Sequence, residues 1–149
     1  MKINRSLNTT IVCDDNLFVL NEFKNEVIIN KLDDLKDLKS SFIVFNDFLR
    51  LLNNKEKDIL LSNLEKKGIH FLNITSDIEE SLFADELKVV YHGKVMLEGF
   101  TLSVLKEEKL LKRLGYRIPF IVDLSLQLNS YDLIDSIFLD EEVLVDKLW

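Results

Sequence analysis

Cysteine and proline are almost absent from this sequence, and each shortage excludes something. The single Cys13 excludes an internal disulfide and is typical of a protein kept in a reducing, cytoplasmic setting. Because the thiol stands alone beside Val12, we interpret it as a small strand residue and not as a reactive nucleophile. Pro119 is the only proline, and no proline-rich or low-complexity linker divides the chain.

Glycine is equally scarce in the first half of the chain. All four glycines, Gly68, Gly93, Gly99 and Gly115, lie after residue 67. Phosphate-binding loops need glycine, because their backbone must approach the phosphate closely. The first 67 residues therefore contain no glycine-based phosphate loop, and the pattern G-x-x-x-x-G-K-[ST] occurs nowhere in the sequence.

Positive charge is the third shortage, with 19 Lys and Arg against 26 Asp and Glu and a net charge of −7. We expect no nucleic-acid partner, because phosphate binding needs a concentrated positive surface. Long hydrophobic runs are also missing: no apolar stretch could span a bilayer, and residues 1–5 open no signal-peptide pattern. We expect a cytoplasmic protein that is at most peripheral to a membrane, through a protein partner.

The chain does contain enough apolar content, 47% of its 149 residues, to form a compact core. Its beginning is β-rich: Thr9–Cys13, residues 17–20 and residues 26–29 are short β-prone runs separated by polar turns. Residues 32–38 have helical spacing. The sequence therefore predicts a β-rich N-terminus with one short helix.

A strand–helix–strand unit follows. Residues 41–45 form a continuous apolar run that ends at Asn46 and Asp47, as expected of a strand buried on both faces. A helix is predicted over 53–67, with an asparagine to cap its start and a glycine after its end. Residues 69–75 form a second buried strand, so the lengths predict a right-handed parallel βαβ crossover.

The remaining elements follow from local patterns. Residues 76–79 form a capping box in which Ser76 opens a helix, and residues 87–98 predict a β-hairpin. From Thr101 onward the pattern is helical, with further helices that start near Pro119 and after Asp140. We therefore expect two domains, an α/β core over 1–100 and a helical extension over 101–149.

Several segments of this core are similar to the ATPase cassette of ABC transporters. Residues 42–47 (FIVFND), the helix after Asn53 and residues 69–81 follow the order of the cassette's Walker B strand and switch region. Residues 83–90 and 93–99 resemble the segment that comes next. The resemblance implies an α/β fold with a truncated P-loop-NTPase-like core.

The C-terminal part narrows the resemblance. Residues 111–120 (LKRLGYRIPF) and 140–149 (DEEVLVDKLW) look like the C-terminal helical extension of the ATPases of energy-coupling factor (ECF) transporters. These transporters serve vitamin and transition-metal uptake, and in this family the extension pairs two ATPase subunits. The resemblance covers residues 41–149.

The resemblance also implies that the catalytic positions have changed. The aspartate that helps to hold magnesium falls at Asn46, whose neutral amide is a poorer ligand for a hard cation. The catalytic glutamate falls at Asp47, one methylene short of the length that positioned phosphoryl transfer needs. The D-loop aspartate falls at Asn53 and the switch histidine at Ser76.

Other parts of such a cassette are missing. No Ser-Gly-Gly signature occurs, and only 40 residues precede the segment that resembles Walker B, which is too few for a P-loop, a Q-loop and a helical subdomain. We therefore expect a pseudo-ATPase with no catalytic residues, no bound cofactor and no metal.

Each remaining candidate has a simpler interpretation. Asp47 could act as a general base, but a solvated carboxylate at a strand end is favoured. Ser76 could be a nucleophile, but its capping position gives it a structural role. His70 and His92 match no compact metal site, and the acidic pair at 14–15 is typical of a solvated turn.

The helical extension carries more apolar residues than an appendage needs for its own packing. Such surface often marks an interface. The candidates for an interface are Phe120, Ile121, Leu124, Leu128, Ile134 and Phe138.

Our main hypothesis is a non-catalytic interaction module that forms a homodimer or binds an intact ABC ATPase subunit. The alternative is a split ATPase part, which contributes to nucleotide binding in complex with an intact subunit for vitamin or metal-ion uptake. A third possibility, a decayed fragment without a role, is disfavoured because the capping and strand patterns are regular.

Overall fold

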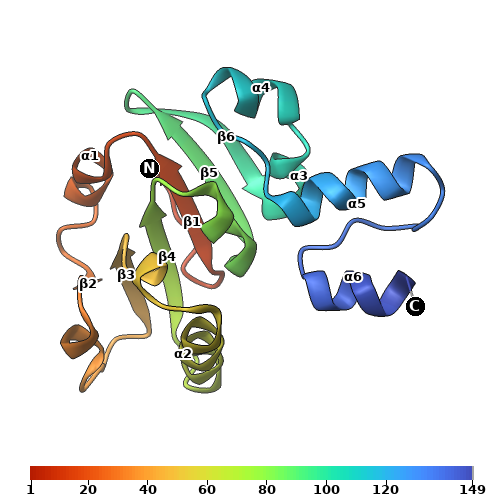
Figure 1. Cartoon of the computed structure of the whole chain (residues 1–149). Helices are drawn as coiled ribbons and strands as arrows, with labels where there is room; N and C mark the ends of the chain where they lie inside the picture. The colour runs from red at the N-terminus through yellow and green to blue at the C-terminus, as the bar shows by residue number, and fades with distance from the viewer. Residues whose placement is uncertain (149) are drawn as a thin grey trace. The chain divides into compact units, whose positions relative to one another are not determined.

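The computed structural model describes residues 1–148 (Figure 1). Close contacts divide the chain into two compact units, Met1–Thr101 and Leu102–Trp149. No helix of the described residues is long and apolar enough to cross a membrane.

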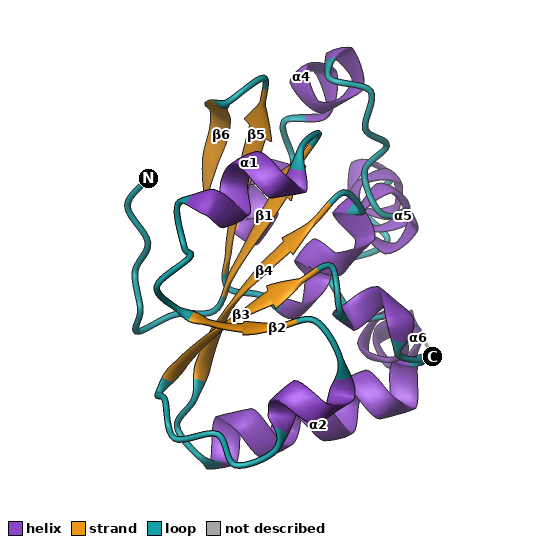
Figure 2. Ribbon diagram, turned by 90° about the vertical axis from the view of Figure 1, so that its left-hand side faces the viewer, coloured by secondary structure: helices purple, strands orange, loops and turns teal. Residues whose placement is uncertain are grey.

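The first unit is built on a mixed sheet with the strand order β2-β3-β4-β1-β5-β6 (Figure 2). The strands are β1 (Thr9–Cys13), β2 (Val27–Ile29), β3 (Phe42–Asn46), β4 (His70–Thr75), β5 (Glu86–Tyr91) and β6 (Lys94–Phe100). The first five strands pair in parallel, and β6 pairs antiparallel with β5. The predicted α/β class, the parallel pairing of the two buried strands and the hairpin are confirmed.

Helices and short 3₁₀ turns connect the strands and complete the second unit. They are α1 (Asn16–Asn21), η1 (Leu32–Leu35), η2 (Leu49–Leu51), α2 (Asn54–Lys66), η3 (Ile78–Phe83), α3 (Thr101–Leu105), α4 (Glu108–Arg113), α5 (Phe120–Ser130) and α6 (Glu141–Leu148). The helices expected near Pro119 and after Asp140 are confirmed as α5 and α6.

Two local predictions were wrong. Residues 17–20, predicted as a strand, belong to helix α1, because the Asp15 carboxylate accepts a hydrogen bond from the Phe18 N–H (3.2 Å) and starts a helical turn there. The segment after β4 is the 3₁₀ turn η3, and it is capped by Asp77 and not by Ser76, because the Asp77 carboxylate accepts a hydrogen bond from the Glu79 N–H (3.0 Å). Asn53, in contrast, caps α2 as predicted.

The apolar strands bury both faces of the sheet in two separate clusters. Ile11 and Leu72 pack with Val19 of α1 in one cluster. Phe45 and Phe71 pack with residues of α2 in the other, their ring centroids 5.5 Å apart. Each strand alternates its side chains between the faces, so one apolar run supplies both clusters, as expected of a strand buried on both sides.

A buried ion pair ties α2 to η3. The Glu80 side chain is only 3% exposed, and its Oε1 accepts a hydrogen bond from the Lys57 ammonium at 3.1 Å. The ammonium also lies 5.1 Å from the centre of the Phe83 ring. Burial raises the pKa of Glu80, and Lys57 offsets part of that rise. The carboxylate therefore depends on Lys57 to stay charged at low solvent exposure.

We expect Lys57→Met to lower the free energy of unfolding by about 3 kcal/mol at pH 7.5, because Glu80 keeps a buried charge without its partner. The loss should shrink at pH 5.5. Without Lys57 the pKa of Glu80 rises further, so the folded state takes up a proton that the unfolded state does not, and stability increases as the pH falls. Urea unfolding at both pH values measures this difference in the free energy of unfolding.

The control is Lys55→Met, at an exposed position of α2. If Lys57→Met lowers the free energy of unfolding equally at both pH values, the prediction is contradicted.

Cys13 is also buried, at the end of the central strand β1, and its thiol donates to Asn16 Oδ1 (3.1 Å). Burial raises the pKa of Cys13 to about 12, with smaller contributions from Asp14, Asp15 and Asp47. We expect a thiol reagent at pH 8 to modify the folded protein at least ~100-fold more slowly than the protein unfolded in urea, because only the thiolate reacts. Similar rates in the two states would show that Cys13 is accessible.

Candidate functional site

The candidate site lies at the edge of the sheet where the parallel strands end. Strands β1, β3, β4 and β5 run in the same direction, so the residues after them arrive at one edge. In open parallel sheets, ligands bind outside this edge, where neighbouring connections leave in opposite directions. Strand β1 lies between β4 and β5 in the sheet, and β3 lies next to β4. The residues that follow β1, β3, β4 and β5 therefore define the candidate site.

At the end of β3, Asn46 is held by another side chain. Its Nδ2 donates to Asn30 Oδ1 at 2.6 Å, and Asn30 directly follows β2. The amide therefore links two neighbouring strand ends. A neutral amide in this position supplies no negative charge to a cation.

Asp47 is bound on both carboxylate oxygens. Its Oδ1 accepts from the Thr75 hydroxyl at 3.0 Å, and its Oδ2 pairs with Arg50 Nε at 2.7 Å. The backbone at Asp47 has φ 49°, and its N–H donates to the Ile74 carbonyl. The side chain is 17% exposed. The Asp47 carboxylate was predicted to be solvated, but it is bound within the chain, to Thr75 of β4 and Arg50 of η2.

The other two altered positions do not join this network. Asn53 caps α2: its Oδ1 accepts from the Glu56 N–H (2.8 Å), and the Glu56 carboxylate accepts from the Asn53 N–H. Ser76 is exposed in the turn after β4 and does not cap a helix. The structure thus places Asn46 and Asp47 at the edge of the sheet, whereas Asn53 lies at the start of α2.

Two carboxylates follow the central strand β1. Asp15 caps α1, and both Asp14 oxygens accept from the His92 N–H at 3.3 Å. The acidic pair therefore links β1 to the hairpin turn between β5 and β6 and is not a freely solvated turn. With Phe18 and Gly93, these groups border a hollow of about 270 Å³.

The histidines do not meet. His92 lies in the turn after β5, whereas His70 starts β4 and is therefore at the opposite edge of the sheet. Within residues 1–148, no group of three or more His, Cys, Asp or Glu side chains is arranged to hold a metal ion.

The edge carries a negative electrostatic field. Asp14, Asp15 and Asp47 each act on the Cys13 thiol and raise its pKa, after burial, which is the largest cause. Arg50 is already paired with Asp47, and within residues 1–148 no other lysine or arginine forms an ion pair with these three carboxylates. Phosphate oxygens would meet carboxylates here without unpaired positive charge to balance them.

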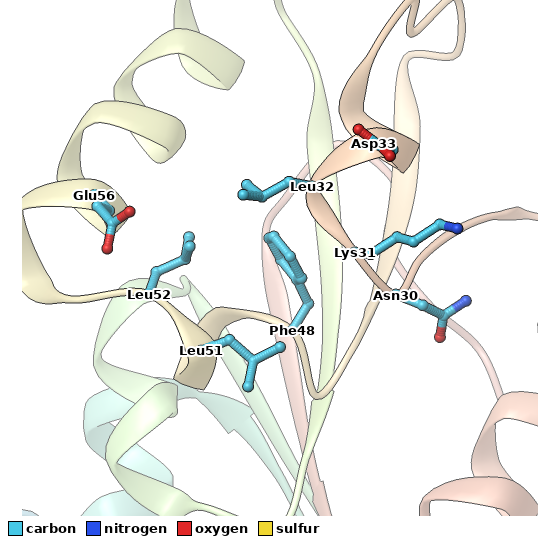
Figure 3. Close-up of a pocket in the computed structure, with 8 residues that line it drawn as sticks. All are labelled: Asn30, Lys31, Leu32, Asp33, Phe48, Leu51, Leu52 and Glu56. Atoms are coloured by element: carbon cyan, nitrogen blue, oxygen red, sulfur yellow. The ribbon is translucent and has the colours of Figure 1, made fainter.

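A second hollow, of about 410 Å³, opens beside the Asn30–Asn46 contact (Figure 3). Leu32 and Leu51 line it and are 62% and 66% exposed. This hollow was not predicted from the sequence, in which the available signal is the leucine-rich stretch that follows Phe48. Its residues are Asn30, Lys31, Leu32, Asp33, Phe48, Leu51, Leu52 and Glu56. Four of these residues are apolar, and among the polar ones the side chains of Asn30, Asp33 and Glu56 are bound to other residues of the chain.

The predicted interface residues of the second unit divide into two groups. Phe120 is 65% exposed. Ile121 and Ile134 are 4% and 6% exposed, so they belong to the core and offer no free surface. Leu124, Leu128 and Phe138 are half-buried. Other apolar side chains are exposed instead: Tyr131, Leu133, Val143, Val145 and Leu148.

Comparison with known proteins finds no protein-family model that matches this chain, but it does find related sequences. An energy-coupling factor transporter ATP-binding protein of Mycoplasmoides gallisepticum is 31% identical over 98 residues, which cover 64% of this chain and 35% of that protein. The corresponding protein of Halalkalibacterium halodurans is 31% identical over 116 residues, covering 75% of this chain and 42% of that protein. The chain spans less than half the length of these relatives.

Two solved structures are also similar in part. A dimeric bacterial ABC transporter cassette matches at 22% identity with a TM-score of 0.39, over 46% of this chain and 31% of that one. A CbiO subunit of an ABC transporter complex from Clostridium perfringens matches at 20% identity with a TM-score of 0.40, over 58% of this chain and 36% of that one. The predicted resemblance is confirmed by the related sequences: this chain is similar, over less than half of their length, to the ATP-binding subunits of ECF transporters.

Proposed function

We propose that this chain is a non-catalytic relative of ECF ATP-binding subunits that acts as a protein-interaction or dimerisation module. The observation that carries the proposal is the state of the candidate site. Asn46 and Asp47, which stand at the positions of the family's magnesium ligand and catalytic carboxylate, are each bound to other side chains of the same chain. Binding a nucleotide would first require these contacts to break.

The electrostatics of the site support the same conclusion. A strand, a turn and the start of a helix form the common phosphate-binding arrangement, in which free backbone N–H groups face the phosphate. Strand β1 and helix α1 have this order, but Asp14 and Asp15 occupy the turn, and Asp15 already accepts the Phe18 N–H. Carboxylates thus stand where a phosphate would need donors.

Exposed apolar surface supports an interaction role. In the second unit Phe120 is exposed, and in the first unit Leu32 and Leu51 flank an open hollow. Such surface is typical of protein contacts. The relatives are named as transporter ATP-binding proteins, so the partner is a second copy of this chain or an intact ATP-binding subunit. Any contact with a membrane would then pass through that partner.

Calorimetric titration with Mg-ATP should give no saturable heat at nucleotide concentrations up to about 1 mM, because Asp14, Asp15 and Asp47 stand at the edge where the phosphates would bind. An intact ECF ATP-binding subunit is the positive control. Saturable binding with a stoichiometry near one would overturn the proposal and favour the alternative, a split ATPase part that needs its nucleotide site.

Size-exclusion chromatography with light scattering should show an oligomer at micromolar concentration, and Phe120→Ser should weaken the association about tenfold, because an exposed aromatic side chain is a typical anchor of an interface. Ile59→Ser, at an exposed position of α2, is the matched control.

A monomer at all micromolar concentrations, alone and with an intact ABC ATPase subunit, would contradict the proposed role. If the chain binds that subunit and Mg-ATP strengthens the binding, the split-ATPase alternative gains. Equal binding with and without Mg-ATP removes that alternative.

A further inference from the structure

Strand β6 lies at one end of the sheet of the first unit, and within residues 1–148 it pairs with β5 alone (Figure 2). Six of its seven residues are exposed, and Leu97 is half-buried. Phe100, at the end of the strand, is 66% exposed. An edge strand carries backbone N–H and C=O groups without partners, which form a template for pairing with another extended chain. The outer edge of β6 is therefore a candidate interaction surface.

The pairing with β5 shows which backbone groups of β6 face outward. In an antiparallel ladder, residue pairs that exchange backbone hydrogen bonds alternate with pairs that exchange none. The Thr101 N–H donates to the opposite Asp85 carbonyl at 3.0 Å, so this pair is bonded. The next residue of β5, Glu86, turns its N–H to a carbonyl just before β1 (3.1 Å). By this alternation the N–H and C=O groups of Phe100 and Glu98 point away from β5, toward the open edge.

A β-bulge limits the length of this edge. Val89 stands opposite Leu97, but the next residue of β5 stands opposite Val95. Met96 is therefore an extra residue, which bends the strand and interrupts a long ladder. The regular part of the open edge runs over residues 97–100, and α3 begins at Thr101. The edge thus suits a short segment and not the growth of an extended sheet.

The side chains along this edge set the chemistry of a partner strand. Glu98 and Phe100 are two residues apart, so their side chains lie on the same face of the sheet. Lys88 binds Glu98 Oε2 at 2.8 Å, yet 60% of the Glu98 side chain remains exposed. A cation opposite Glu98 on a paired strand would be attracted, and a carboxylate there would be repelled. The net charge of −7 also favours a cationic segment.

A second copy of this chain does not meet these requirements. Antiparallel pairing about a two-fold axis sets one residue opposite its own counterpart. A register centred on Glu98 brings two carboxylates together, and one centred on Gly99 leaves Glu98 opposite Phe100, without an opposite charge. Registers centred on the ends of this segment run into the bulge on one side and into α3 on the other. The edge therefore favours a strand of a different sequence.

We propose that the outer edge of β6 binds an extended segment of a partner protein as an additional strand, with a lysine or arginine of that segment opposite Glu98. The outward backbone groups of Glu98 and Phe100 supply the main-chain hydrogen bonds, and the Phe100 ring supplies an apolar contact. The inference rests on the proposed interaction role and adds to it a surface and the chemistry of the partner.

Hydrogen exchange of the unmodified chain, followed residue by residue by NMR, tests which amides the partner covers. The probe is a short synthetic peptide of alternating valine and threonine with a central lysine. Saturation with this peptide should slow exchange of the Glu98 and Phe100 amides at least ~10-fold, because they gain hydrogen-bond partners. The Gly99 amide, which faces β5 by the same alternation, should change little. Unchanged exchange at Glu98 and Phe100 overturns the inference.

Two substitutions at one position separate the backbone contact from the charge. Glu98→Pro removes the outward N–H and the carboxylate, whereas Glu98→Thr removes the carboxylate alone. Fluorescence anisotropy of the labelled peptide should show at least ~10-fold weaker binding to Glu98→Pro, because a main-chain hydrogen bond is lost. Glu98→Thr should bind about threefold more weakly, and it should no longer prefer the lysine peptide to the same peptide with a central glutamate.

Folding and net charge are controlled separately. A proline whose N–H would face solvent is tolerated in an edge strand, and urea unfolding of Glu98→Pro checks that the variant folds. Glu65→Thr makes the same change in net charge as Glu98→Thr at an exposed position of α2. It should bind the peptide as the unmodified chain does. If Glu65→Thr weakens binding as much as Glu98→Thr, net charge explains the effect and the assignment to β6 fails.

The remaining outcomes separate this inference from the proposed function. A chain that does not bind the lysine peptide, but associates with itself or with an ATPase subunit, overturns the inference and leaves the interaction role intact. If the Glu98 and Phe100 amides become protected without peptide as the chain concentration rises, the occupant is a second copy, and the assignment to a different protein is wrong. A chain that binds neither the peptide, nor itself, nor an ATPase subunit overturns the interaction role as well.

Discussion

The parallel pairing of β1, β3, β4 and β5 is the constraint on which the candidate site depends. Because these strands run in one direction, Asp14, Asn46, Asp47 and Thr75 arrive at one edge from distant parts of the chain. Polar groups crowded above a buried core need partners. Here they find them in one another: Asn46 with Asn30, Asp47 with Thr75 and Arg50, and Asp14 with the hairpin turn.

A site whose polar side chains bind one another differs from a site whose polar groups are free to bind a ligand. A catalytic carboxylate keeps an oxygen available for water or metal, and its scaffold holds it in that position. Both oxygens of Asp47 are bound, one by the hydroxyl of Thr75 on the neighbouring strand and the other by Arg50. These contacts stabilise the edge of the sheet, and the same contacts oppose nucleotide binding. This opposition is the physical argument for the interaction role proposed above.

The sequence predicted the parts of the structure that depend on near neighbours. The cap of α2 at Asn53, the buried strand that ends at Asn46 and the hairpin depend on contacts within a few residues. Residues 17–20 were misassigned because a short apolar run suits strand and helix alike, and one capping bond from Asp15 decided the outcome. The pairing of Asp47 with Thr75 spans 28 residues and needs the sheet register, so no local pattern could predict it. The same reason explains why Ile121 and Ile134 could not be told from surface residues.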